Sequence, residues 1–126
     1  MHKIYFDGGT RLNATALYDE DLDFYDHRKI EFRMTNNQLE YMAMFSAMEY
    51  ASSIYNLSEC CFVGDSQVII EQMRGDYDVV NPGLQILNKK VVEFIVNLIG
   101  HLPTVDMFEW VRREHNYAGV YLEKLG

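Results

Sequence analysis

Three acidic residues stand at places where an apolar segment of the chain begins or ends. Asp7 lies near the end of the β-rich segment His2–Gly9, and Asp65 directly follows the short apolar run Glu59–Gly64. Glu40 lies in the first turn of a helical pattern, at the head of an apolar face. Each acid alone has an ordinary explanation: a turn former at Asp7, a helix cap at Asp65, and at Glu40 a charge that favours a helix start.

Together, the three positions favour one carboxylate cluster. Acids at the ends of strands are a common way to build a site on an α/β scaffold. Such a cluster repels itself unless it binds cations. Oxygen ligands alone suit Mg²⁺ or Mn²⁺, and a pair of these ions is the arrangement that cleaves phosphodiesters. We therefore expect Asp7, Glu40 and Asp65 to hold two divalent ions.

The composition limits the fold and the class of function. A chain of 126 residues with 48% hydrophobic residues can bury the core of one domain, residues 1–126. The net charge of −8 argues against broad, passive nucleic-acid binding. It does not exclude a nuclease whose metal ions supply positive charge locally.

The cysteines and the hydropathy indicate where the protein works. Cys60 and Cys61 are adjacent and would point to opposite faces of a strand, so we expect two unbridged thiols in a reducing compartment. We find no signal peptide and no apolar run of membrane-spanning length. These features predict a cytoplasmic protein that does not enter a membrane.

Periodicity and turn residues predict the elements that must position the acids. Thr35 and Gln38 form a predicted capping box at the start of a long helix. We predict three strands at the start, His2–Gly9, Arg11–Tyr18 and Phe24–Arg33, with an acidic turn at Asp19–Asp23 between the last two. A helix over 36–55, a buried strand at Glu59–Gly64 and a short helix after Asp65 follow. After a loop at Gly75–Gly83 we predict an amphipathic helix from Leu84 to Leu98, a strand at Thr104–Arg112 and a closing helix from about Asn116.

Five segments match a known family in order and spacing: IYFDGGT, TNNQLEYMAMFSAMEYA, FVGDSQVIIEQMRG, VNPGL and FEWVRREHNYAG. On these segments the chain resembles type I ribonuclease H over nearly its whole length. The resemblance implies the ribonuclease H-like α/β fold, a five-stranded mixed sheet with its first three strands antiparallel and helices on both faces. It also implies an endonuclease that uses two Mg²⁺ or Mn²⁺ ions to hydrolyse the RNA strand of RNA–DNA hybrids.

Carried over residue by residue, the resemblance makes Asp7, Glu40 and Asp65 the metal-binding catalytic acids. It also implies six substrate contacts, namely Gly8, Asn36 and Gln67 at the backbone or minor groove of the hybrid, and Asn13, Arg33 and Thr35 at a phosphate of the DNA strand. A guanidinium, a hydroxyl and an amide can all donate to phosphate oxygens.

The chain departs from the family in three places. LNATALY replaces a Gly/Pro-rich continuation, and the loop Gly75–Gly83 stands in place of the basic protrusion of some members. Without that protrusion we expect substrate binding that is weaker or is aided by a protein partner. We also expect a monomer. Gly119 occupies the place of the family's fourth carboxylate. Glu123 could reach toward the metals from the same helix face or be an ordinary exposed acid, and His115 could assist proton transfer or be a surface histidine.

Two other functions remain open. The first is a nucleic-acid-binding module on the same fold whose catalysis is weakened or lost with the fourth acid. The second is a proofreading exonuclease of the same superfamily, which we rank last because that group needs D-x-E in the first strand and Gly9 stands two residues after Asp7. Incubation with a labelled hybrid and Mg²⁺ or Mn²⁺ separates the nuclease from the binding module.

Overall fold

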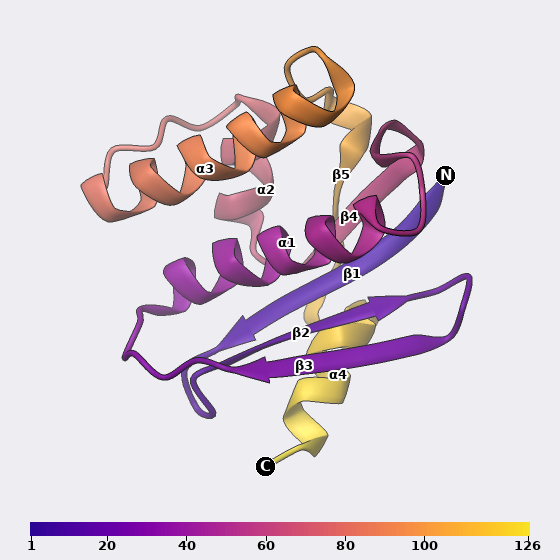
Figure 1. The fold of residues 1–126 in the computed structure, drawn as a ribbon. Coiled ribbons are helices and arrows are strands. Elements are labelled where there is room, and N and C mark those ends of the chain that lie inside the picture. Colours follow the sequence, from indigo (N-terminus) through magenta and orange to yellow (C-terminus); the bar gives the residue numbers. More distant parts are fainter.

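A mixed sheet with the strand order β3-β2-β1-β4-β5 organises the computed structural model, which describes residues 1–126 (Figure 1). Its five strands are β1 (His2–Gly9), β2 (Ala14–Asp19), β3 (Phe24–Lys29), β4 (Cys60–Gly64) and β5 (Phe108–Trp110). β2 is antiparallel to both β1 and β3, whereas β4 is parallel to both β1 and β5. The predicted five-stranded mixed sheet with three antiparallel strands at its start is confirmed.

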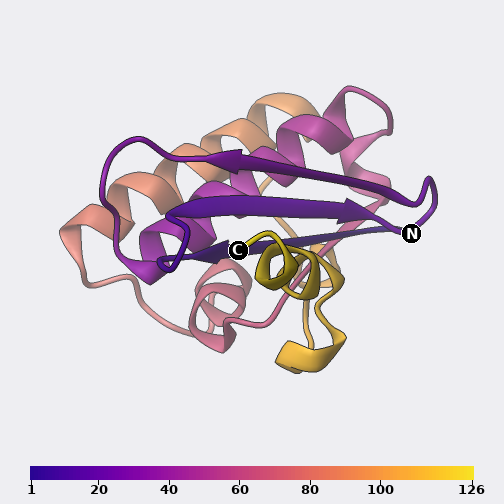
Figure 2. The same ribbon diagram turned by 90° about the horizontal axis from the view of Figure 1, so that it is seen from below.

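Helices cover both faces of this sheet, as predicted. They are α1 (Asn36–Ser52), α2 (Gln67–Arg74), α3 (Pro82–Ile99) and α4 (Tyr117–Lys124). Side chains of α1, α2 and α3 share one core with the sheet, while α4 packs alone on the other face. Figure 2 shows α4 on the opposite side of the strands from α1 and α3. No helix has both the length and the apolar character that a membrane span requires.

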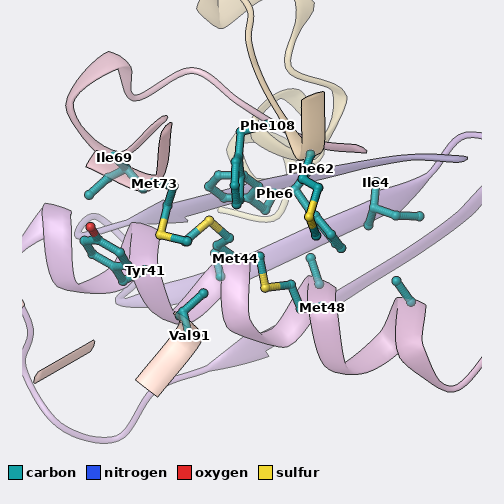
Figure 3. Close-up of a cluster of buried hydrophobic side chains, with 14 of the residues drawn as sticks. Ile4, Phe6, Tyr41, Met44, Met48, Phe62, Ile69, Met73, Val91 and Phe108 are labelled. Carbon is teal, nitrogen blue, oxygen red and sulfur yellow. The ribbon is translucent and has the colours of Figure 1, made fainter. Parts of the chain in front are cut away.

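The larger core fills the space between the sheet and helices α1 to α3. Figure 3 shows its centre, where Phe6, Phe62 and Phe108 of three neighbouring strands meet Met44 and Met48 of α1. All five side chains are almost completely buried. Burial of this apolar surface fixes α1 across the sheet and so fixes the direction in which its first turn points.

The two cysteines lie in β4 and remain unbridged, as expected. Cys60 belongs to the larger core and Cys61 to the smaller core under α4. Both thiols are free and buried. The alternation of side chains along a strand separates them, since successive residues face opposite sides of the sheet.

The start of α1 agrees with the predicted capping box. The Thr35 hydroxyl accepts a bond of 3.2 Å from the Gln38 backbone N–H, and the Gln38 side chain accepts one of 2.9 Å from the Thr35 N–H. The helix ends at Ser52, three residues before the predicted end. These two caps satisfy N–H groups that the first turn of a helix leaves without partners.

Strands β2, β3 and β5 are shorter than predicted. β2 begins at Ala14, because Asn13 has a left-handed φ of 49° and closes a turn after β1. β3 ends at Lys29 instead of Arg33. The chain then leaves the sheet toward α1, and the Asn13 side chain donates to the carbonyls of Ile30 and Phe32 at 2.7 Å. β5 is likewise reduced to Phe108–Trp110.

Asp19 was wrongly predicted to lie in an acidic turn. It is the last residue of β2 and is fully buried. Its carboxylate accepts hydrogen bonds from the hydroxyls of Tyr50 at 2.6 Å and Tyr55 at 2.7 Å. These tyrosines, one in α1 and one just after it, make Asp19 an anchor between the helix and the sheet.

Five tyrosines that are scattered along the sequence form one aromatic cluster. Tyr5, Tyr18 and Tyr25 lie side by side on three strands, and Tyr117 and Tyr121 of α4 pack against them. This cluster lies on the α4 face of the sheet. Strand pairing and the docking of α4 bring together residues that are far apart in the chain.

Candidate active site

The three predicted acids converge at one edge of the sheet. Asp7 lies two residues before the end of β1, and Asp65 directly follows the last residue of β4. Because β1 and β4 are parallel neighbours, their carboxyl ends meet at the same edge. Glu40 reaches this edge from the fifth residue of α1, just past the first turn in which it was expected. Each acid offers a carboxylate oxygen within 4.8 Å of the others. The cluster inferred from the three separate positions is therefore present.

Gly8 allows α1 to come this close to β1. A Cβ atom at residue 8 would lie 2.4 Å from the carbonyl carbon and oxygen of Leu39, in the first turn of α1. The Gly8 backbone N–H donates to a carboxylate oxygen of Glu40 at 2.5 Å. Glu40 is 1% exposed, so this N–H is an important partner of a charge removed from water. Gly8 thus sets the position of Glu40 by both size and hydrogen bonding.

We predict that Gly8→Ala destabilises the protein by about 1–3 kcal/mol, because the added methyl group must push the first turn of α1 away from β1. Urea-induced unfolding measures the change. Gly9→Ala is the matched control, since a Cβ there would meet only the end of the flexible Leu122 side chain at 3.3 Å. Equal stability of the two variants would contradict the proposed role of Gly8.

Burial is the main cause that raises the pKa values of all three acids. Burial, followed by the charge of Asp65, raises the pKa of Asp7 to about 6. Burial and the charge of Asp7 raise the pKa of Glu40 well above its usual value. Burial also raises the pKa of Asp65, against the opposing effects of the Asn116 hydrogen bond and the Arg113 charge. The cluster is therefore held in an unfavourable ionised state that a bound cation would relieve.

The acids face a cavity of about 300 Å³ at the surface. Its walls are mostly polar, and its lining residues are Asp7, Gly8, Gly9, Thr10, Arg11, Leu12, Asn36, Glu40, Asp65, Arg113, Leu122 and Glu123. Glu123 and Arg113 form an exposed ion pair of 3.2 Å in this lining. We call this space the acid cavity.

Gly119 of α4 lies directly against the acids. A Cβ atom at this buried position would be 3.2 Å from a carboxylate oxygen of Asp7 and 3.5 Å from one of Asp65. A side chain at residue 119 would thus enter the cluster, as expected if this position corresponds to the fourth carboxylate of type I ribonuclease H. Glycine leaves that place without a ligand.

Solved structures of other proteins share this geometry of the fold. No family model matches the chain. RNase H1 from the halophilic archaeon Halobacterium salinarum NRC-1 shares 26% sequence identity with it and superimposes with a TM-score of 0.79, over 96% of this chain and 92% of that one. The N-terminal RNase H domain of a Mycobacterium tuberculosis protein shares 25% identity, with a TM-score of 0.73 over 96% and 94% of the two chains.

In fold and in sequence the chain is similar to type I ribonuclease H. A further similar structure is LC11-RNase H1 in complex with an RNA/DNA hybrid, at 24% identity and a TM-score of 0.81 over the full length of both chains. LC11-RNase H1 was isolated from compost by a metagenomic approach. Its likeness to this chain concerns the fold.

The residues expected at a DNA-strand phosphate lie around the loop before α1. Asn13 is buried, and its amide bonds to the backbone of the loop at Ile30, Phe32 and Met34. Thr35 caps α1. Arg33 is exposed between them. In this ribonuclease H-like chain Asn13 and Thr35 therefore shape the loop, and the Arg33 side chain is the one of the three left free for a ligand.

The other predicted contacts lie at different distances from the acids. Asn36 lines the acid cavity, whereas Gln67 is exposed at the first position of α2, two residues after Asp65. Ser66 caps α2 and accepts from the Ile69 N–H, so Asp65 is not the cap. His115 is exposed in the short 3₁₀ segment before α4 and is not among the residues that line the cavity.

Two residues near the acids were not predicted from their positions in the sequence. Trp110 is 44% exposed, and its indole N–H donates to the Asp65 carbonyl at 3.0 Å. Arg113 is an unpredicted positive charge in the acid cavity. Nothing in the local sequence marks Arg113, because its place depends on how α4 docks on the sheet.

Proposed function

We propose that the protein is a metal-dependent endoribonuclease that hydrolyses the RNA strand of RNA–DNA hybrids. The observation that carries this proposal is the convergence of Asp7, Glu40 and Asp65 in one cavity of a type I ribonuclease H-like fold. The hybrid bound to LC11-RNase H1, which has the same fold, supports the choice of substrate.

The donor set fits two Mg²⁺ or Mn²⁺ ions. Asp7, Glu40 and Asp65 would hold them, since these hard cations prefer oxygen ligands and the three acids share one edge of the sheet. When bound, such ions activate a water as the nucleophile and offset the charge that develops on the scissile phosphate. The chain itself orients the carboxylates: the Gly8 N–H holds Glu40, and the Trp110 indole holds the backbone at Asp65.

Substrate recognition would use groups on either side of the acids. Asn36 in the cavity wall and Gln67 at the start of α2 carry amides that can reach the 2′-hydroxyl or base edges, which distinguish RNA from DNA. Gly8 would contact the hybrid through its backbone, since the position of its missing side chain faces Leu39 of α1. With a net charge of −8, we expect double-stranded DNA to be neither cut nor bound well.

The test is cleavage of a hybrid labelled on its RNA strand, with Mg²⁺ or Mn²⁺ and with EDTA. We expect internal cuts in the RNA of the hybrid and none in double-stranded DNA. Gly119, which removes a carboxylate from the cluster, favours one second candidate: a module that binds the hybrid with weakened or no catalysis. Metal-independent binding without cleavage would support that candidate and reject the enzyme.

Arg33 is the proposed phosphate contact that a salt titration can test. We predict that Arg33→Ala weakens hybrid binding and lowers the slope of log K against log salt concentration by about one phosphate contact. Lys3→Ala is the control, because Lys3 lies at the opposite end of β1 and pairs with Glu109 at 3.4 Å. An unchanged slope in Arg33→Ala would remove Arg33 from the phosphate site.

Glu123 is the candidate replacement for the fourth acid. It lines the acid cavity, but its carboxylate is paired with Arg113, so it must leave this partner to serve a metal. We predict that Glu123→Gln lowers cleavage roughly tenfold at limiting Mn²⁺ and little at saturating Mn²⁺. Glu93→Gln on α3 is the control. If Glu123→Gln cuts as fast as wild type at limiting metal, the site works with three carboxylates and water, or with help from His115.

The remaining proposals concern the surroundings of the enzyme. We propose a monomer, which sedimentation equilibrium can test, and a protein partner that strengthens hybrid binding where the family's basic protrusion is missing. A submicromolar Kd of the isolated chain for the hybrid at physiological salt would make that partner unnecessary. The cytoplasm stays the predicted location, consistent with the two free cysteines, and fractionation of the source cells would test it.

A further inference from the structure

Asn116 connects the acid cluster to the closing helix. It precedes α4, is fully buried, and lies beside the ends of β1 and β4. Its amide N–H₂ donates to the Phe6 carbonyl at 2.9 Å and to a carboxylate oxygen of Asp65 at 3.2 Å. One side chain thus joins the backbone next to Asp7 to the carboxylate of Asp65.

This arrangement has two costs to stability. Asn116 occupies the N-cap position of α4, where asparagine normally accepts from the first N–H groups of the helix, but its side chain makes no capping bond. Its carbonyl oxygen is also the one buried side-chain polar atom of the protein without a hydrogen-bond partner. Buried polar groups are usually paired, so such an exception calls for an explanation.

Rotating the amide by half a turn would not remove the second cost. The carbonyl oxygen would then face the Phe6 carbonyl and the Asp65 carboxylate, both of which are acceptors. The two bonds therefore fix which atom is nitrogen. The Asn116 side chain therefore neither caps α4 nor has a partner for its oxygen, yet it donates a hydrogen bond to an acid of the cluster.

No other side chain of the C-terminal segment 113–126 hydrogen-bonds to the acid cluster. Gly119 has no side chain to offer, and Glu123 is bonded to Arg113. Asn116 is therefore the polar link between α4 and the acids.

We propose that Asn116 is a positioning residue, which orients the Asp65 carboxylate toward Asp7 and Glu40 for binding a divalent ion. The inference rests on the proposed metal site, but not on cleavage. Residues that orient metal ligands typically contribute roughly 10- to 100-fold to metal affinity. In this chain that contribution would come from an amide of the segment that lacks the fourth acid.

Asn116→Ser separates positioning from a structural role. Serine is as good an N-cap as asparagine, and its shorter side chain cannot span the two acceptors. We expect Mn²⁺ affinity, measured by isothermal titration calorimetry, to fall roughly 10- to 100-fold. We expect the melting temperature in EDTA to change little, because the cap that α4 gains and the removal of the unpaired oxygen offset the loss of the two bonds to Phe6 and Asp65. A structural role alone would leave Mn²⁺ affinity unchanged.

Asn81→Ser is the matched control. Asn81 caps α3 in the usual way, accepting from the Leu84 N–H at 3.1 Å, so serine can replace it there. We expect this variant to bind Mn²⁺ as wild type does. If Asn116→Ser does not fold, Asn116→Thr, which also caps well, replaces it with the same expectation. Affinity within twofold of wild type in the folded variant would overturn the inference.

The outcome can be told apart from a failure of the proposed function. Wild-type protein that binds Mn²⁺ but leaves the hybrid uncut would reject the nuclease, and the Mn²⁺ affinity of Asn116→Ser would still decide the role of Asn116. Wild-type protein that binds no Mn²⁺ would overturn both.

Discussion

Asp7→Asn is expected to lower hybrid cleavage by at least about 10³-fold, which corresponds to about 4 kcal/mol of transition-state stabilisation. Asp7 interacts with both other acids: its charge raises the pKa of Glu40, and the charge of Asp65 raises the pKa of Asp7. Asparagine keeps the shape of the side chain but is a much weaker ligand for Mg²⁺ or Mn²⁺. The fold is expected to stay intact, because Asp7 makes no hydrogen bond on which an element depends.

Single-turnover cleavage of the labelled hybrid measures this effect, with circular dichroism as a check of the fold. Asp78→Asn is the control, since Asp78 is an exposed acid in the loop between α2 and α3. It removes the same charge from the protein and should cut normally. Substantial cleavage by Asp7→Asn would mean that the acid cluster is not the catalytic centre.

The metal-free protein is expected to lose stability as the pH rises toward neutrality. The pKa of Asp7 is raised from 3.8 to about 6 in the folded protein. Between these values the folded state binds more protons than the unfolded state, so stability falls as the pH rises. The stabilisation is complete below about pH 4 and is lost through about pH 6. For Asp7 alone the loss is on the order of 1–3 kcal/mol.

Urea unfolding in EDTA at a series of pH values tests this expectation. Asp7→Asn should be more stable than wild type at pH 7, and the difference should shrink toward pH 4, where both side chains are neutral. Mn²⁺ at about 100 times its Kd should restore about 2.7 kcal/mol to wild type at pH 7. Identical pH profiles for the two proteins would show that Asp7 carries no strain in the absence of metal.

The positions of the acids could be predicted because they depend on local features. An acid at the end of an apolar strand, or in the first turn of a capped helix, is visible in a short stretch of sequence. Thr35 and Gln38 similarly mark the start of α1 because both halves of the capping box lie within four residues. Parallel neighbours then bring strand ends to one edge, so Asp7 and Asp65 had to lie close once β1 and β4 paired.

The ends of the strands were less predictable. Arg11 and Arg33 were assigned to strands, but both lie outside them. The reason is the Asn13 side chain, which binds the backbone of the loop before α1 and draws it away from the sheet. Such a bond joins residues 17 and 19 positions apart, which no local pattern can reveal.

By itself, the sequence determined the order of the elements and the positions of the three acids, since periodicity, caps and turn residues act over a few positions. The mixed sheet was implied by the resemblance to type I ribonuclease H. Only the tertiary structure decided which polar groups surround those acids. Gly119, Arg113 and Asn116 reach the cluster because α4 docks on the face of the sheet opposite α1. That docking comes from burial of apolar side chains, which is non-directional and depends on the whole fold. A side chain's partners across such a contact are therefore set by packing, not by its neighbours in the chain.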